Sequence, residues 1–318
     1  MLKGALKLLR VSALPSALAD VLGGSALALA ALPHASRTLY VQEKLPWLVL
    51  TTIGIYLGGM GLNDLLHRHK DTALNKPRPM VTGAISTEAA ALVTGLLYAL
   101  GLTSSIFAGC ATPALVLALA TLAYNALALG KVERGQVRLS AVAALLGVAT
   151  LAFARGLHVL LPLYALSGGE GSPFGVVPVV FAAVLAYFWL VTLVSLFEDR
   201  GGGRRALGLV QAALLPVTFA VPLWALVQGD RGHPLIEDLL PMVIAATLYL
   251  WLSYALLRAR QEPTPRNLGR CVGLGIRGEC LMMAAIALAL MPQEPAWGAG
   301  AILCYPAAAL MSKWVSPT

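Results

Sequence analysis

Charge is scarce in this chain: only 12% of its 318 residues are Asp, Glu, Lys or Arg, against about 25% in an ordinary soluble domain. Cysteine and histidine are scarce too, with four and five residues. The cysteines show no C-x-x-C spacing, so we expect neither a disulfide nor a metal–thiolate cluster. No internal repeat and no long linker divides the chain, and we therefore expect one domain over residues 1–318.

Hydrophobic residues make up 58% of the chain and gather in long runs. Because about 20 mostly apolar residues cross the hydrocarbon of a bilayer as a helix, each run is a candidate span. The runs lie near 11–32, 46–62, 85–109, 112–130, 139–166, 176–196, 206–228, 237–257 and 271–291. We expect an all-α, polytopic membrane bundle of about nine helices. A further stretch at 296–312 contains Pro306 and is interpreted as a tenth span or an interfacial tail.

Lysine and arginine indicate the orientation of the bundle, since short cytoplasmic loops carry the positive excess. Most of the 23 Lys and Arg residues lie before the first run and after the second, fourth, sixth and eighth runs. The loops on the other side hold only Arg37, Lys44 and Arg231. The N-terminus is therefore expected in the cytoplasm. The net charge of +8 follows from this topology, so we expect membrane lipids, and not nucleic acid, as partners.

The charged segment GLNDLLHRHKDTALNKPRPMVTG, residues 61–83, directly follows the second run. On a helix with about 3.6 residues per turn, Asp64, His67 or Arg68, and Asp71 fall along one face. Two carboxylates one or two turns apart suit a hard cation that is shared with a phosphate, as Mg²⁺ usually is. The alternative is a solvated loop in which the aspartates merely balance the basic residues.

The same segment carries a resemblance to a known family. Its N-D-x-x-H-x-x-x-D and K-P-R-P-M-V-T-G runs resemble the N-D-x-x-D-x-x-x-D and R-P-x-x-S-G runs of the UbiA superfamily of intramembrane prenyltransferases. Further landmarks agree in order: Leu9-Arg10 before the first run, Tyr124 and Lys131 around the end of the fourth, and an acidic loop after the sixth. The resemblance thus covers most of the chain.

The resemblance implies a fold, a reaction and a set of site residues. A central cavity would open to the cytoplasmic side of a bacterial-type inner membrane. There a prenyl diphosphate, held by Mg²⁺ between two acidic motifs, would alkylate a lipophilic or aromatic acceptor. Asp64, Asp71 and Glu198 would be the catalytic and metal-binding residues. The candidate substrate-binding residues are Asn63, Arg78, Lys131, Arg155, Asp20 and Arg204.

Two departures from the family pattern stand out. His67 replaces the middle aspartate of the first motif, and hard cations prefer oxygen ligands. In the second, SLFEDRGGGRRALG at 195–208, Glu198 and Asp199 are adjacent, so they would point about 100° apart on a helix and Glu198 would serve alone. The three following glycines would free backbone N–H groups for a phosphate, or form a plain cytoplasmic turn.

These departures resemble features of a divergent UbiA-like group known as EboC, associated with export of secondary metabolites in bacteria. That resemblance rests on the E-x-x-G-G loop, on F-A-R-G-L-H-V-L-L-P at 153–162 and on P-T-P-R-N-L-G-R at 263–270. It leaves open a catalytically reduced protein that binds or transports an isoprenoid or a secondary metabolite. An unrelated secondary transporter would show repeated halves, which the sequence lacks.

Charged residues inside the apolar runs are independent indicators, because ionisable side chains in a bilayer usually face a cavity or a partner. Four stand out: Asp20, Arg155, Arg277 and Glu279. Asp20 and Arg277 lie at comparable depth in the first and ninth runs, so we expect them to line one cytoplasm-facing cavity and suggest that they pair. A structural ion pair between these helices is the alternative. Arg155 lies deeper and would bind an anionic acceptor or helix carbonyls.

Overall fold

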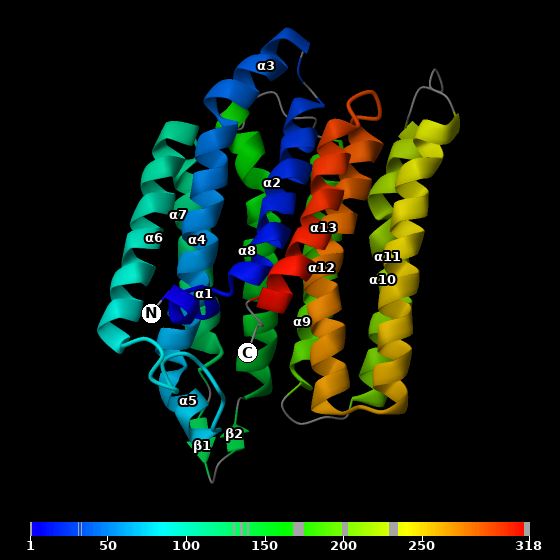
Figure 1. Ribbon diagram of the computed structural model, residues 1–318. Helices are drawn as coiled ribbons and strands as arrows, with labels where there is room; N and C mark the ends of the chain where they lie inside the picture. Colours follow the sequence, from blue (N-terminus) through cyan, green and yellow to red (C-terminus); the bar gives the residue numbers. More distant parts are fainter. Residues whose placement is uncertain are drawn as a thin grey trace.

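The chain forms a bundle of long helices with a small β-hairpin at one end, seen in a computed structural model (Figure 1). The structure describes all residues except 1, 31, 33, 130, 134, 135, 139, 168–174, 199–202, 229–234 and 315–318. In chain order the elements are α1 (Leu2–Leu8), η1 (Val11–Ala13), α2 (Leu14–Leu29), α3 (His34–Glu43), α4 (Leu45–Leu66), α5 (Arg68–Ala73), α6 (Thr87–Ala108), α7 (Ala111–Leu127), β1 (Lys131–Glu133), β2 (Gln136–Arg138), α8 (Ala141–Ser167), α9 (Val177–Ser195), α10 (Arg204–Gln228), α11 (Leu235–Gln261), α12 (Pro265–Leu290) and α13 (Ala296–Trp314).

The predicted spans correspond to helices of the bundle. Among the described residues, 8 helices are long and apolar enough to cross a membrane, and α7 is a shorter apolar helix in the place of the fourth run. The prediction of an all-α membrane bundle is therefore confirmed. The hairpin of β1 and β2, which pair antiparallel with Lys131 opposite Arg138, stands outside the bundle next to α5 (Figure 1).

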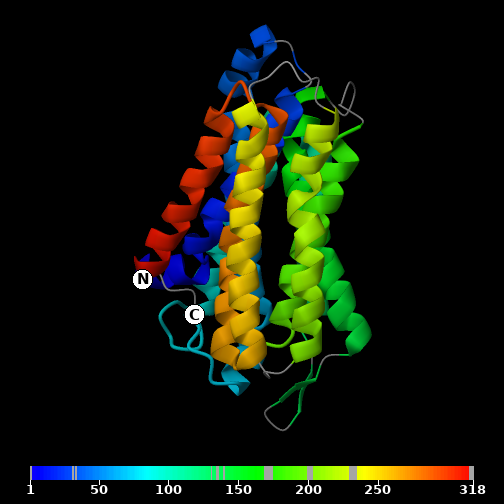
Figure 2. The same ribbon diagram turned by 90° about the vertical axis from the view of Figure 1, so that its right-hand side faces the viewer.

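The stretch predicted as a tenth span or an interfacial tail forms α13, a helix of 19 residues. It packs against both α2 and α12. It runs back along the bundle from the end of α12 toward the level of α1 (Figures 1 and 2). This helix is not among the candidate spans found in the described residues, and it covers the seam between the first and the ninth predicted spans.

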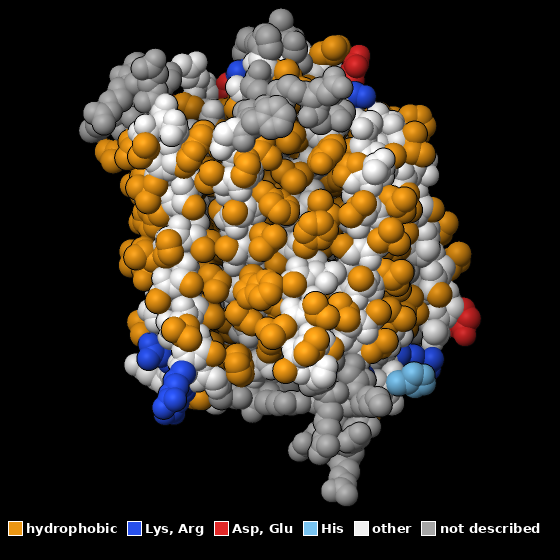
Figure 3. All heavy atoms as spheres, turned by 180° about the vertical axis from the view of Figure 1, so that it is seen from behind, with side chains coloured by type: hydrophobic (Ala, Val, Ile, Leu, Met, Phe, Trp, Pro, Cys, Tyr) orange, Lys and Arg blue, Asp and Glu red, His pale blue; other side chains and the backbone are white. Residues whose placement is uncertain are grey.

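On the face of the bundle that Figure 3 shows, apolar side chains cover the middle, and charged side chains lie toward the two ends. Large hydrophobic residues are well exposed on several helices, among them Leu96 at 61%, Leu209 at 74% and Leu250 at 65%. A soluble monomer rarely exposes contiguous apolar patches of more than a few hundred Å². The chain is therefore a multi-pass membrane protein whose apolar belt faces lipid.

Helices α4 and α6 approach closely at a pair of glycines. A Cβ added to Gly54 would lie 2.4 Å from the backbone nitrogen of Gly101 and 2.5 Å from the carbonyl oxygen of Leu97. Small residues at such contacts let membrane helices pack with their backbones close together. Gly54 and Gly101 thus allow α4 and α6 to pack closely.

We expect Gly54→Ala to destabilise the protein by about 1–3 kcal/mol, because the added methyl forces α4 and α6 apart. The apparent melting temperature of the purified protein in detergent measures this loss. Gly95→Ala is the matched control, since Gly95 lies on α6 and an added Cβ there meets nothing within 4 Å. Equal melting temperatures for the two variants would contradict the close contact.

Candidate functional site

The acidic run lies where α4 passes into α5. The first helix ends at Leu66 and the second begins at Arg68, so the predicted continuous helix is interrupted at His67. The backbone N–H of Asp71 still donates to the carbonyl of His67 at 2.9 Å, which carries the helical register across the junction. Asp64, His67 and Asp71 are buried, with 2%, 5% and 5% exposure. His67, and not the exposed Arg68, therefore shares the buried face with the two aspartates.

Arg10 forms hydrogen bonds with two residues at the end of α4, next to this buried face. Its Nη2 donates to Asp64 Oδ1 at 3.2 Å and to Asn63 Oδ1 at 3.3 Å. The Asn63 amide donates in turn to Asn125 Oδ1 on α7 at 2.6 Å. Arg10 has a left-handed backbone, with φ 45° and ψ 47°, a conformation that is uncommon outside glycine and that often marks functional sites. In the sequence Arg10 is only a landmark before the first apolar run, and its contact with Asp64, 54 residues away, cannot be read from spacing.

Arg78 forms an ion pair with the second aspartate of this face. Its Nε lies 3.6 Å from Asp71 Oδ2. Burial and the neighbouring Arg10 lower the pKa of Arg78, while three carboxylates, those of Asp64, Asp71 and Glu198, act in the opposite direction. The acidic residues of both predicted motifs thus act electrostatically on one guanidinium group.

Glu198 reaches this region from the end of α9. A Cβ added to Gly269 at the start of α12 would lie 2.9 Å from Glu198 Oε1, so the carboxylate rests against that backbone. Asp199 and the first two glycines of the loop lie outside the described residues. Gly203 is described: its φ of +79° favours glycine, and an added Cβ would lie 2.9 Å from the Phe197 ring.

Two predicted substrate-binding residues are not seen at the acidic site. Arg204 is exposed at the start of α10, and its Nη2 donates to the carbonyl of Gln261 at 3.2 Å. The backbone of Lys131 pairs in the hairpin, but its side chain lies outside the described part of the structure. The predicted residues that belong to the acidic site are Asn63, Asp64, Asp71, Arg78 and Glu198.

The acidic face leaves two buried polar atoms open to a divalent cation. Asp64 Oδ2 and His67 Nε2 are both buried without a hydrogen-bond partner among the described residues. Within the same residues, no group of three or more His, Cys, Asp and Glu side chains holds a preformed metal site. The protein thus supplies part of a ligand set, which fits an ion bound by one or two carboxylates together with water and phosphate oxygens.

A second charged cluster lies about 20 Å along α8 and α12 from their ends at the acidic site, at 1.5 Å per residue. Arg155 Nη2 lies 3.0 Å from Asp20 Oδ2 and also forms an ion pair with Glu279. All three are buried, with exposures of 6%, 0% and 0%. The guanidinium carbon lies 4.6 Å from the centre of the Phe188 ring and 5.4 Å from that of Tyr56. One arginine thus ties α2, α8 and α12 together.

The suggested pair of Asp20 with Arg277 is wrong, because Asp20 pairs with Arg155. Arg277 is half-buried, and its Nε donates to the carbonyl of Gly273 one turn back in its own helix, at 3.2 Å. Residues two apart on a helix point about 200° from one another. With Glu279 turned into the cluster, Arg277 therefore lies on the other side of α12.

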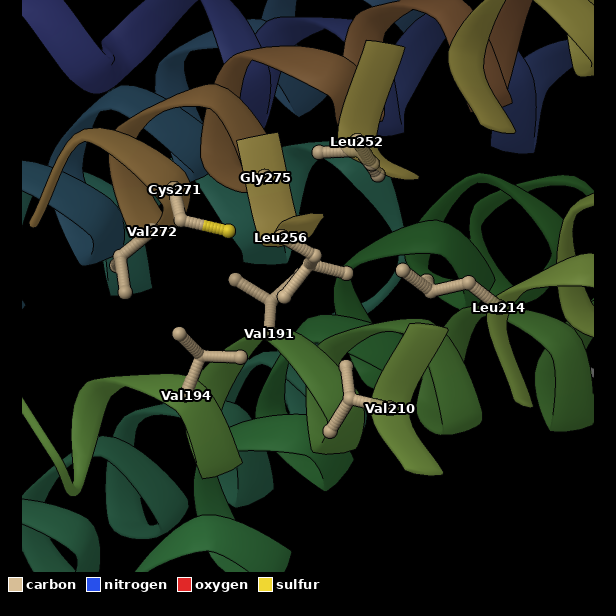
Figure 4. A pocket seen from close by; sticks show the side chains of 9 residues that line it. All are labelled: Val191, Val194, Val210, Leu214, Leu252, Leu256, Cys271, Val272 and Gly275. Carbon is tan, nitrogen blue, oxygen red and sulfur yellow. The ribbon is translucent and has the colours of Figure 1, made fainter. Parts of the chain in front are cut away.

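An apolar cavity of about 10 Å³ lies among α9, α10, α11 and α12. Figure 4 shows the side chains that surround it: Val191, Val194, Val210, Leu214, Leu252, Leu256, Cys271, Val272 and Gly275. This volume holds no more than about one water molecule. The predicted central cavity, open to the cytoplasm and wide enough for a substrate, stays a prediction.

Comparison with known proteins identifies relatives. The sequence profile of the UbiA prenyltransferase family matches residues 17–270. No curated protein matches the sequence significantly.

Several solved structures share the fold at low identity. A structure of digeranylgeranylglyceryl phosphate synthase is similar with a TM-score of 0.58 at 17% identity, covering 92% of this chain and 99% of the other. A UbiA homologue from Aeropyrum pernix K1 has a TM-score of 0.56 at 17% identity, with 85% and 96% coverage. A UbiA homologue from Archaeoglobus fulgidus bound to GPP and Mg²⁺ has a TM-score of 0.53 at 18% identity, with 88% and 99% coverage. The EboC-like subgroup stays a prediction.

Proposed function

The chain belongs to the UbiA prenyltransferase family, and from this premise we propose that it transfers a prenyl group from a prenyl diphosphate to a lipophilic or aromatic acceptor within the membrane. The observation that carries the proposal is the buried acidic face of α4 and α5. It places Asp64 and Asp71 beside Arg10 and Arg78, where the two arginines can meet the anionic end of such a substrate.

The proposed reaction begins when the bond between the prenyl C1 and the diphosphate oxygen breaks. Negative charge then grows on the departing diphosphate, and groups that bind it more tightly at that stage accelerate the step. Arg10 and Arg78 supply fixed guanidinium donors for this charge. The acceptor's nucleophilic atom bonds to C1, and its proton leaves to solvent or to a base.

A divalent cation would add positive charge to the diphosphate oxygens; Mg²⁺ is bound with GPP in the Archaeoglobus homologue, and we propose it, or an ion of the same charge, here. Asp64, Asp71 and Glu198 are the proposed ligands and catalytic residues. The proposed substrate contacts are Asn63, Arg78, Lys131 and Arg204 around the diphosphate, and Asp20 and Arg155 deeper in the bundle. The apolar interior keeps water from the prenyl cation.

The proposed location is a bacterial-type cell membrane with the N-terminus in the cytoplasm. The support is the concentration of lysine and arginine at one end of the bundle, including the segment with Arg68, Lys70, Lys76 and Arg78. In this orientation the acidic site faces the compartment that supplies a water-soluble diphosphate head group, while the prenyl tail enters the apolar interior of the bundle.

The test is release of diphosphate by the purified protein from geranyl, farnesyl and geranylgeranyl diphosphates, with Mg²⁺ and candidate aromatic acceptors. Mass spectrometry of the lipid phase detects the alkylated acceptor. We expect release that depends on both the protein and the metal. Absence of release from every substrate, with folded protein, would refute the transferase function.

Glu198→Gln tests the second acidic motif separately. We expect diphosphate release to fall about 10- to 100-fold, the range for loss of a group that orients the residues around a metal, because Glu198 acts on Arg78. Glu43→Gln removes an exposed carboxylate from α3, at the other end of the bundle, and should leave the rate unchanged. A rate that is equal in both variants would remove Glu198 from the site.

A non-catalytic role is the second candidate, and the ion pairs of the acidic face favour it. Arg10 already neutralises Asp64, and Arg78 lies beside Asp71, so the face can bind an anionic head group through its arginines alone. Such a protein would bind or help transport an isoprenoid without breaking it. Binding of a prenyl diphosphate that persists in EDTA, without release, would support this function against the first.

A further inference from the structure

His67 offers an open ring nitrogen at the acidic site. The residue is 5% exposed, and its Nε2 is buried without a hydrogen-bond partner among the described residues. Because buried polar atoms in folded proteins are nearly always partnered, this nitrogen is open to a ligand. A histidine ring nitrogen is the commonest protein ligand for a metal ion.

The neighbouring Asp64 offers an open atom as well. Its Oδ2 is buried without a hydrogen-bond partner among the described residues, while its Oδ1 accepts from Arg10. One ring nitrogen and one carboxylate oxygen are thus left open at this end of the bundle.

The two open atoms lie on one buried helical face, three residues apart. We infer that His67 supplies a nitrogen ligand, so that the site binds a first-row transition-metal dication such as Mn²⁺, Co²⁺ or Zn²⁺ in preference to Mg²⁺. Imidazole nitrogen favours these ions, whereas Mg²⁺ demands oxygen. The identity of the ion rests on the proposed function, because a prenyl diphosphate is needed to complete the ligand set.

The experiment loads the purified full-length protein with Mn²⁺ and geranyl S-thiolodiphosphate, an analogue that does not ionise. Pulsed electron paramagnetic resonance then detects nitrogen nuclei coupled to the bound Mn²⁺. We expect a histidine nitrogen signal in the wild type that is lost in His67→Asp. His69→Asp is the matched control, because His69 is exposed on the same short helix, and it should keep the signal.

Competition gives a second readout on the same samples. Displacing Mn²⁺ should require an Mg²⁺ concentration about ten-fold or more higher in the wild type than in His67→Asp, where an oxygen ligand suits Mg²⁺. If His67→Asp does not fold, the wild type labelled with ¹⁵N-histidine decides. Replacing ¹⁴N by ¹⁵N changes the nitrogen coupling to Mn²⁺ only if a histidine ring coordinates the ion.

Two negative results have different meanings. Bound Mn²⁺ without nitrogen coupling, displaced equally by Mg²⁺ in both proteins, would overturn the ligand role of His67 and leave the proposed function standing. If neither ion binds to the wild type with the analogue, the metal site and the metal-dependent reaction both fail.

Discussion

Replacing Arg155 with methionine is expected to lower the unfolding free energy by about 3–5 kcal/mol, the usual cost of removing one partner from a buried ion pair. The reason is that Asp20 and Glu279, both 0% exposed, would remain in an apolar bundle without their cation. The apparent melting temperature in detergent, followed by size-exclusion chromatography, measures the loss. Arg277→Met is the control, since Arg277 bonds to its own helix, and it should cost far less.

The same cluster predicts a rescue. The triple variant Asp20→Asn, Arg155→Met, Glu279→Gln removes every formal charge together, and such replacements are often neutral or stabilising. We expect it to regain most of the lost melting temperature. Because Asp20 and Arg155 are proposed substrate contacts, we also expect the triple variant to release diphosphate more slowly than the wild type. A stable triple variant with full activity would instead limit this cluster, in which the guanidinium contacts two carboxylates and two aromatic rings, to a structural role.

Asp64→Asn is expected to reduce diphosphate release by about 100-fold or more, the scale seen when one group that stabilises developing charge is removed. The substitution keeps the shape of the side chain and an oxygen that can accept from Arg10, so the contact at 3.2 Å can survive. What it removes is the negative charge that would hold a cation. The measurement is the initial rate of release at saturating prenyl diphosphate.

Glu262→Gln is the matched control for Asp64→Asn, because Glu262 is an exposed carboxylate just before α12. It changes the charge of the protein by the same amount and should leave the rate unaltered. Melting temperatures of both variants should equal that of the wild type. Full activity in folded Asp64→Asn would show that the charge of this residue takes no part in the reaction.

Hydropathy predicted the bundle because an apolar run is a local property: the length that crosses a bilayer can be read directly along the chain. The β-hairpin and α3 were not predicted, since both are short and depend on where longer helices end. The helical face with Asp64 and Asp71 was predicted from spacing alone. The break at His67 and the exclusion of Arg68 from that face required the structure.

Partners in distant helices were beyond the sequence. Arg155, Asp20 and Glu279 are each conspicuous as charges in apolar runs, but which of them meet depends on how α2, α8 and α12 are rotated about their axes. The comparable depths of Asp20 and Arg277 in their spans favoured a pair between them, but Arg277 lies on the other side of α12. Arg10 was missed for a similar reason: its left-handed backbone turns the side chain toward α4.

The contact between Arg10 and Asp64 has a thermodynamic consequence. A cation that approaches Asp64 has to compete with a guanidinium already 3.2 Å from its Oδ1, so the ion alone gains little. A diphosphate that draws Arg10 away frees the carboxylate for the ion, and the ion in turn frees Arg10 for the diphosphate. Because such coupling is reciprocal, each ligand should raise the affinity of the other by the same factor, and the two should load together.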